Sequence, residues 1–138
     1  MECATEIKIR GYHADFYGHV NNARYLEFLE EDRWRWLEEH IDLQKWSEKN
    51  LTFVAVNINI NYRKVLNVGE TIVVSTRIDK ISVHSVVLLQ EIVVKNTQQC
   101  AADALVTFVI IDRDGGVLSL DDPRIAELQK LLQNEVGG

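Results

Sequence analysis

The sequence is poor in the residues that build disulfide frameworks and zinc sites. Its only two cysteines, Cys3 and Cys100, stand far apart, with neither a Cys-x-x-Cys pair nor a neighbouring histidine. This spacing argues against a disulfide scaffold or a structural metal site. We therefore expect no metal and no other cofactor. Two reduced thiols are typical of a cytoplasmic protein.

Long hydrophobic runs and an excess of positive charge are also missing. The longest apolar stretches, such as residues 104–111, are far shorter than the roughly 20 residues that cross a bilayer. The polar, acidic start of the chain does not resemble a signal peptide. We expect no stable membrane association. With 15 basic and 21 acidic side chains the formal net charge is −6, which disfavours a main role in binding nucleic acid.

The length and composition predict a single domain over residues 1–138. A chain of 138 residues is close to the usual size of one domain. Its hydrophobic content of 46% is enough to build a core without disulfides.

Hydrophobic periodicity predicts the order of the elements. Residues 5–11 read as a short strand. From residue 22 to about residue 40 apolar side chains recur at intervals of three and four, which indicates one long helix. Residues 53–62 alternate strictly and predict a half-buried strand, with one apolar face formed by Val54, Val56, Ile58, Ile60 and Tyr62.

The second half of the chain predicts a sheet and a final helix. Three β-branched runs, at residues 70–81, 84–95 and 101–112, are joined by segments short enough for antiparallel hairpins. Asp122 and Pro123 are suited to open a terminal helix as N-cap and first helical residue. The order predicts an α+β domain in which one curved antiparallel sheet must cover one helix.

The most unusual stretch lies directly ahead of the long helix. Asn21 is a plausible N-cap whose side-chain oxygen would accept from the N–H of Ala23 or Arg24. The N–H of Asn22 would then stay unpaired at the positive end of the helix dipole. Such a donor can hold an oxyanion.

Asp15 precedes this helix by six residues, on a turn that Gly18 can bend back. Its carboxylate is therefore expected near the same point as the Asn22 N–H. A carboxylate beside an oxyanion donor suits acyl transfer. The alternative is that Asp15 only caps a turn, as aspartate commonly does.

At this stretch the chain resembles a known family. The pattern resembles the signature of the 4-hydroxybenzoyl-CoA thioesterase-like group of hotdog-fold proteins, through Asp15-x-x-Gly18-His19-Val20-Asn21-Asn22-x-x-Tyr25 followed by Glu30 and Arg33. Within that group it is most similar to the bacterial long-chain acyl-CoA thioesterases, through Ile9-Arg10-Gly11-Tyr12-His13, Asn21 to Glu31, Val56-Asn57-Ile58-Asn59 and Ala102-Asp103-Ala104-Leu105. The resemblance covers nearly the whole chain.

The resemblance implies a hotdog fold, a curved antiparallel sheet wrapped around one long central helix. It implies a homodimer or homotetramer with acyl-CoA bound at the subunit interface. The implied activity is hydrolysis of medium- to long-chain fatty acyl-CoA to free fatty acid and coenzyme A. Asp15 would be the catalytic carboxylate, and Asn22 would polarise the thioester carbonyl.

Other residues are expected to support this site. His19 is expected to be structural, and Tyr25 either packs under the acyl group or orients Asp15. The coenzyme A phosphates need positive charge, for which Arg63 and Lys64 are candidates. An apolar slot for the acyl group is expected to include Phe53 and Val54.

Two alternatives remain open. A hotdog-fold enoyl-CoA hydratase or dehydratase would need a working pair of Asp15 and His19, but the hydratase motif resembles Asp-x-Asn-Pro-x-His, and this stretch lacks its proline. A non-catalytic module would bind acyl-CoA without turnover. Glu30 and Arg33, three residues apart on one helix face, are expected to form an ion pair without a chemical role.

Overall fold

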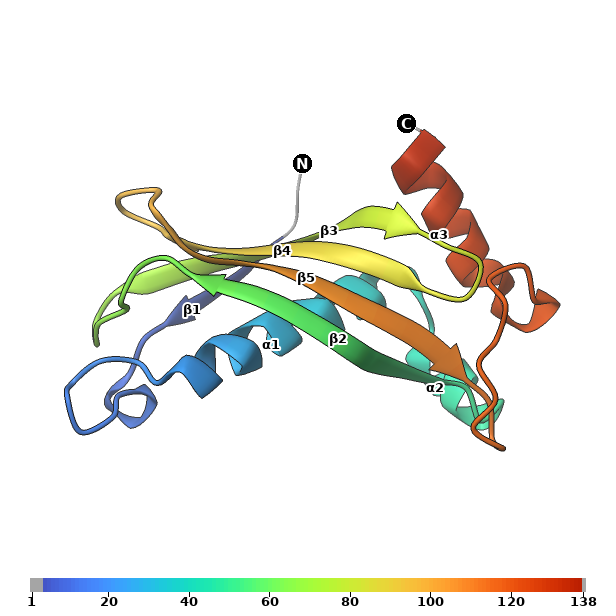
Figure 1. The fold of residues 1–138 in the computed structure, drawn as a ribbon, viewed down its shortest axis with the longest axis horizontal. Helices are drawn as coiled ribbons and strands as arrows, with labels where there is room; N and C mark the ends of the chain where they lie inside the picture. Colours follow the sequence, from blue (N-terminus) through green and yellow to red (C-terminus); the bar gives the residue numbers. More distant parts are fainter. Residues whose placement is uncertain (1–3, 138) are drawn as a thin grey trace. The chain divides into compact units, whose positions relative to one another are not determined.

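The computed structural model describes residues 4–137, which form five strands, three α-helices and two short 3₁₀ turns. The strands are β1 (Thr5–Lys8), β2 (Thr52–Tyr62), β3 (Thr71–Ile81), β4 (Val86–Val94) and β5 (Cys100–Ile111). The helices are α1 (Asn22–His40), α2 (Leu43–Glu48) and α3 (Ala126–Gly137). The 3₁₀ turns are η1 (Gly11–His13) and η2 (Pro123–Ile125), and η2 leads directly into α3 (Figure 1).

The strands form one sheet in the order β1-β3-β4-β5-β2. β1 runs antiparallel to β3, with Thr5 opposite Val74 and Lys8 opposite Thr71. A backbone hydrogen bond from Ser82 to Ser85 closes the turn between β3 and β4. β2 and β5 run in opposite directions (Figure 1). The predicted antiparallel pairing is therefore confirmed.

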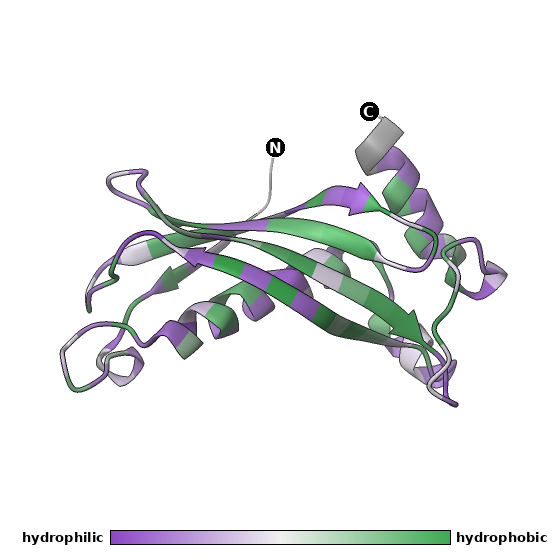
Figure 2. Cartoon of the chain, viewed as in Figure 1, coloured by the Kyte–Doolittle hydropathy of each residue, from purple (hydrophilic) through white to green (hydrophobic). Residues whose placement is uncertain are grey.

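Alternation explains which strand faces are buried. In β4 every second side chain is buried, from Val86 to Val94. In β2 apolar and polar residues alternate along the strand (Figure 2), yet Val56 is 55% exposed and Ile58 is 38% exposed. The prediction of a half-buried β2 is therefore wrong for this chain, because alternation defines the two faces of a strand but not what packs over them, and the apolar face that carries Val56 and Ile58 stays open.

Residue contacts divide the described chain into two compact units. The first unit comprises residues 4–36, 60–76 and 90–104, and the second comprises residues 37–59, 77–89 and 105–137. The core of the first unit includes Ile9, Val20, Tyr25, Leu29, Leu66, Ile72, Val74 and Ile92. The core of the second includes Trp46, Leu88, Phe108, Ile110, Ile125 and Leu128.

A buried polar network joins α1 to the sheet within the first unit. The carboxylate of Asp32 is fully buried and accepts hydrogen bonds from the hydroxyls of Thr5 (2.7 Å) and Thr76 (2.6 Å). The side chain of Gln90 donates to Thr76 (2.7 Å) and to the backbone carbonyl of Leu29 (3.0 Å). Since every polar atom of this network has a partner, it fixes how α1 lies against β3 and β4 in this unit.

Candidate active site

The loop ahead of α1 is a tight, well-anchored turn in the first unit. The N–H of Asp15 donates to the carbonyl of His19 (2.8 Å), and the N–H of Gly18 donates to the carbonyl of Asp15 (3.0 Å). Gly18 has a φ of 76°, in the left-handed region that glycine adopts without strain. The N–H of Val20 donates to the carbonyl of Leu66 (3.1 Å), which holds the loop against the segment after β2.

The Asp15 carboxylate has one oxygen engaged. Its Oδ1 accepts a hydrogen bond from the N–H of Tyr17 (2.9 Å), a contact that both the turn-capping alternative and the catalytic interpretation allow. Among residues 4–137 its second oxygen has no hydrogen-bond donor. The turn thus fixes the side chain through one oxygen and leaves the other free.

The start of α1 matches the predicted cap. The side-chain oxygen of Asn21 accepts from the N–H of Ala23 (2.8 Å), and the N–H of Arg24 donates to the backbone carbonyl of Asn21 (2.9 Å). Within the described part of the chain the N–H of Asn22 has no acceptor. It lies at the positive end of a helix of 19 residues, where negative charge is stabilised.

A cavity of about 510 Å³ in the first unit brings these groups together. Its lining comprises Asp15, His19, Val20, Asn21, Asn22, Tyr25, Tyr62, Arg63, Lys64 and Val65. The candidates Asp15, Asn22, His19, Tyr25, Arg63 and Lys64 are therefore gathered in one place. Phe53 and Val54 belong to the second unit; Phe53 stacks there on Trp46 (ring centroids 4.7 Å apart) and meets Phe108 edge-on.

Asp15 and His19 do not form a hydrogen-bonded pair. Both side chains are exposed, and within residues 4–137 the His19 ring has no hydrogen-bond partner. Their link is through the backbone, from Asp15 N–H to His19 carbonyl. The hydratase alternative needs the two side chains to work together, and this arrangement does not supply that.

Tyr25 is a buried link between α1 and the end of β2. Its hydroxyl donates to the carbonyl of Lys64 (2.8 Å) and accepts from the N–H of Leu66 (3.1 Å). Burial raises the pKa of the Tyr25 phenol, so the group stays neutral. Because both bonds go to the backbone, its hydroxyl does not orient Asp15.

The two cations at the cavity already have acidic neighbours. Arg63 forms an ion pair with Asp103, whose carboxylate also accepts from the amide of Asn61 (3.0 Å). These hydrogen bonds, from Arg63 first and then from Asn61, hold the pKa of the Asp103 carboxyl below its usual range. The Lys64 ammonium lies 3.8 Å from a carboxylate oxygen of Glu70. Neither cation is strongly buried, so both keep access to solvent.

Sequence reasoning missed Tyr62 as a residue of this cavity. Its hydroxyl donates to the backbone carbonyl of Asn22 (3.3 Å), and its ring meets the Tyr25 ring edge-on with centroids 5.2 Å apart. The only sequence signal was its place as the last apolar residue of the β2 alternation. That pattern gives a face of the strand and says nothing of a helix 40 residues earlier.

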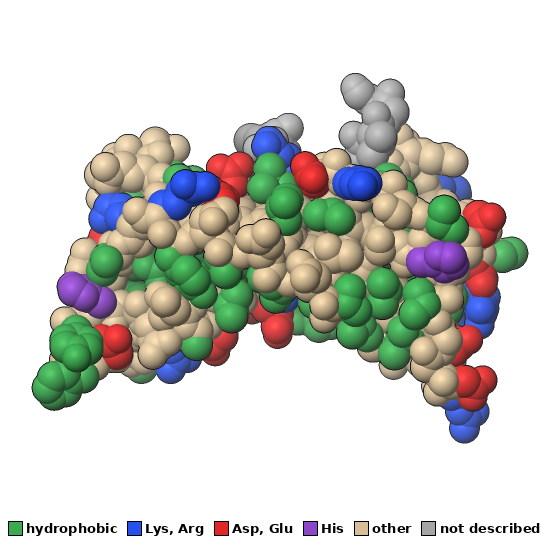
Figure 3. Space-filling model, in the orientation of Figure 1, with side chains coloured by type: hydrophobic (Ala, Val, Ile, Leu, Met, Phe, Trp, Pro, Cys, Tyr) green, Lys and Arg blue, Asp and Glu red, His purple; other side chains and the backbone are tan. Residues whose placement is uncertain are grey.

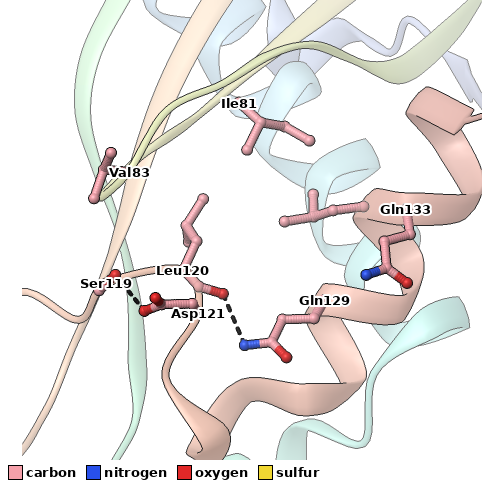
Figure 4. Close-up of a pocket in the computed structure, with 8 residues that line it drawn as sticks. Ile81, Val83, Ser119, Leu120, Asp121, Gln129 and Gln133 are labelled. Atoms are coloured by element: carbon pink, nitrogen blue, oxygen red, sulfur yellow. Dashed lines mark hydrogen bonds between the residues drawn. The ribbon is translucent and has the colours of Figure 1, made fainter.

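A larger hollow lies in the second unit but lacks comparable chemistry. It has a volume of about 780 Å³ and is lined by Ile81, Val83, Ser119, Leu120, Asp121, Gln129, Leu132 and Gln133. In Figure 4 the hydroxyl of Ser119 donates to Asp121 (2.6 Å), and the amide of Gln129 donates to the carbonyl of Leu120 (2.8 Å). Asp121 is the one titratable side chain of this lining and already accepts from Ser119, so we place the candidate site in the smaller cavity.

The described residues provide neither a cluster of metal ligands nor a membrane-spanning helix. Within residues 4–137, no three His, Cys, Asp or Glu side chains are grouped to hold a metal ion. None of the helices in that range is long and apolar enough to span a bilayer. Cys100 is a free thiol, and Cys3 lies outside the described residues.

Comparisons with known proteins identify the family of the chain. The family model of the thioesterase-like superfamily matches residues 10–136. The long-chain acyl-CoA thioesterase FadM of Escherichia coli (strain K12) is 48% identical over 108 residues, which are 78% of this chain and 82% of FadM.

Solved structures show the same fold. The probable thioesterase YbaW from Escherichia coli superimposes with a TM-score of 0.83 at 43% identity, over 92% of this chain and 96% of that one. Slr0204, a 1,4-dihydroxy-2-naphthoyl-CoA thioesterase from Synechocystis, gives a TM-score of 0.79 at 23% identity, over 93% of this chain and 96% of that one. The predicted α+β hotdog fold is confirmed, and the chain belongs to the thioesterase-like superfamily.

Proposed function

We propose that this protein is an acyl-CoA thioesterase of the cytoplasm that hydrolyses medium- to long-chain fatty acyl-CoA to free fatty acid and coenzyme A. The observation that carries the proposal is one cavity that holds both a carboxylate oxygen without a donor, on Asp15, and a helix N–H without an acceptor, on Asn22. The similarity to FadM supports the long-chain acyl group.

The two groups have complementary tasks in this reaction. The Asn22 N–H and the α1 dipole stabilise the negative charge that develops on the thioester oxygen. Asp15 either attacks the acyl carbon to give an anhydride, which water then opens, or removes a proton from an attacking water. By either route the C–S bond breaks and the sulfur leaves as the thiol of coenzyme A after taking a proton. In the general-base route the acyl carbon gains the water oxygen directly. In the anhydride route water attacks the Asp15 carboxyl carbon, so the fatty acid leaves with an Asp15 oxygen and the water oxygen stays on Asp15.

The coenzyme A end is assigned to the basic side of the cavity. Arg63 and Lys64 border it, and both are accessible enough to exchange their acidic neighbours for phosphate oxygens. Phe53 and Val54, in the second unit, stay the proposed acyl-binding residues.

We propose that the active form is a homodimer or homotetramer with the site at the interface of two copies. Large apolar side chains are exposed in the chain, and hydrophobic groups lie on the face drawn in Figure 3. Phe16 is 95% exposed and Tyr17 is 78% exposed, beside Asp15. An exposed apolar surface of this kind is typical of an interface. A monomer by light scattering at micromolar concentration would contradict this part of the proposal.

The test of the activity uses a panel of acyl-CoA thioesters of different chain length, with aromatic acyl groups included. We expect free coenzyme A to be released, fastest from long-chain substrates. Single turnover in ¹⁸O-labelled water separates the two routes, because the anhydride route places the label on Asp15 and the general-base route does not. Absence of release from every substrate would refute the proposal.

A further inference from the structure

Tyr62 reaches the start of α1 from the end of β2. Its hydroxyl lies 3.3 Å from the backbone carbonyl oxygen of Asn22 and is placed to donate to it. The side chain is 41% exposed and lines the cavity with Asp15 and Asn22. This hydroxyl therefore touches the backbone of the residue whose N–H is the proposed oxyanion donor.

The end of β2 is anchored by hydrogen bonds, which fix the position from which the Tyr62 side chain reaches Asn22. Directly after Tyr62 the backbone is fastened by Tyr25, which bonds Lys64 and Leu66. The N–H of Arg63 also donates to the carbonyl of Ala101 in β5 (2.8 Å). The Tyr25 and Tyr62 rings pack edge-on, so the two side chains together contact the first turn of α1.

We propose that Tyr62 is a positioning residue, whose hydroxyl holds the peptide plane of the Asn22 carbonyl and, through the Asn22 Cα that the two planes share, steadies the adjacent plane that carries the Asn22 N–H. The Asn21 cap fixes this turn from its own helix, and Tyr62 fixes it from the strand. The proposal rests on the proposed function. An oxyanion donor must point at the charge that develops in the transition state, so a small change of direction lowers kcat more than it changes substrate binding.

The variant Tyr62→Phe tests this with little other disturbance. Phenylalanine keeps the ring on Tyr25 and removes only the hydroxyl. With a long-chain acyl-CoA such as palmitoyl-CoA, we expect kcat to fall about tenfold and KM to stay within about twofold. The control is Tyr12→Phe, since the Tyr12 hydroxyl is exposed and has no partner among residues 4–137; it should behave as wild type. An unchanged kcat in Tyr62→Phe would overturn the proposal.

A second readout needs no activity. In the free protein, the ¹H and ¹⁵N shifts of the Asn22 amide should move in Tyr62→Phe and stay in place in Tyr12→Phe. A fall in kcat with an unmoved Asn22 amide would mean that the hydroxyl acts on the substrate, and would overturn the positioning role. If the wild type hydrolyses no thioester but the Asn22 amide moves, the proposed function fails while the link from Tyr62 to Asn22 stands. An unmoved amide in an inactive protein would reject both.

Discussion

Replacing Asp32 by alanine should destabilise the protein strongly, although Asp32 takes no part in the proposed chemistry. The Asp32 carboxylate is fully buried and accepts from Thr5, Thr76 and two nitrogens of Arg35, at distances between 2.6 and 3.2 Å. Alanine removes the buried carboxylate that accepts from Arg35, whose side chain is 18% exposed, and from the two threonine hydroxyls.

The size of the effect follows from those partners. Removing one member of a buried ion pair costs about 3–5 kcal/mol. The lower end applies, because Arg35 keeps some access to water and threonine hydroxyls can turn to other acceptors. We expect Asp32→Ala to lower the free energy of unfolding by about 3 kcal/mol.

The assay is urea unfolding followed by circular dichroism, at one protein concentration for all variants because association adds to stability. The control is Glu38→Ala, on the exposed side of the same helix, where we expect a change within about 0.5 kcal/mol. A loss below about 1 kcal/mol in Asp32→Ala would refute the reasoning that this network holds α1 in place.

Two further predictions concern His13 and Tyr25. Burial first, and then the charge of Arg24, lower the pKa of His13 below its ordinary 6.5. Below pH 6.5 the unfolded chain therefore binds more protons than the folded chain. The free energy of unfolding falls as the pH drops from 6.5 through the folded-state pKa. The melting temperature should drop less between pH 7 and pH 5.5 in His13→Gln than in the wild type, and equal drops would contradict this. Tyr25→Phe leaves the buried N–H of Leu66 without an acceptor and should cost about 1–3 kcal/mol in urea unfolding; a loss no larger than that of Tyr12→Phe would count against it.

Periodicity predicted the elements because it depends on local sequence. The long helix was expected from residue 22 to about residue 40, and α1 is Asn22–His40. The burial of β2 could not be predicted in the same way. Alternation gives the two faces of a strand, but exposure depends on what packs over each face, and the apolar face of β2 with Val56 and Ile58 stays open.

In the candidate site, too, contacts between residues close in sequence could be predicted, and contacts between distant residues could not. The cap on Asn21 and the turn at Asp15 involve neighbours in sequence, so residue types alone indicated them. Contacts over long separations were missed, as with Tyr62 and Asn22, which are 40 residues apart.

Arg33 was expected to pair with Glu30, a prediction that follows from helix geometry alone. Instead it donates to Gln90 (3.0 Å), 57 residues later. Burial lowers the pKa of the Arg33 guanidinium, and the nearby charge of Glu30 opposes this effect. Arg33 bonds Gln90 because the sheet places Gln90 at the buried side of the helix.

The most direct test of the central claim is the release of free coenzyme A from a long-chain acyl-CoA, measured by chromatography for the wild type and Asp15→Ala. The control is Asp114→Ala, an exposed aspartate in the turn after β5. With melting temperatures unchanged, we expect turnover to fall by about 10² or more in Asp15→Ala and to stay at the wild-type level in the control. Wild-type turnover that is indifferent to Asp15 would contradict the account.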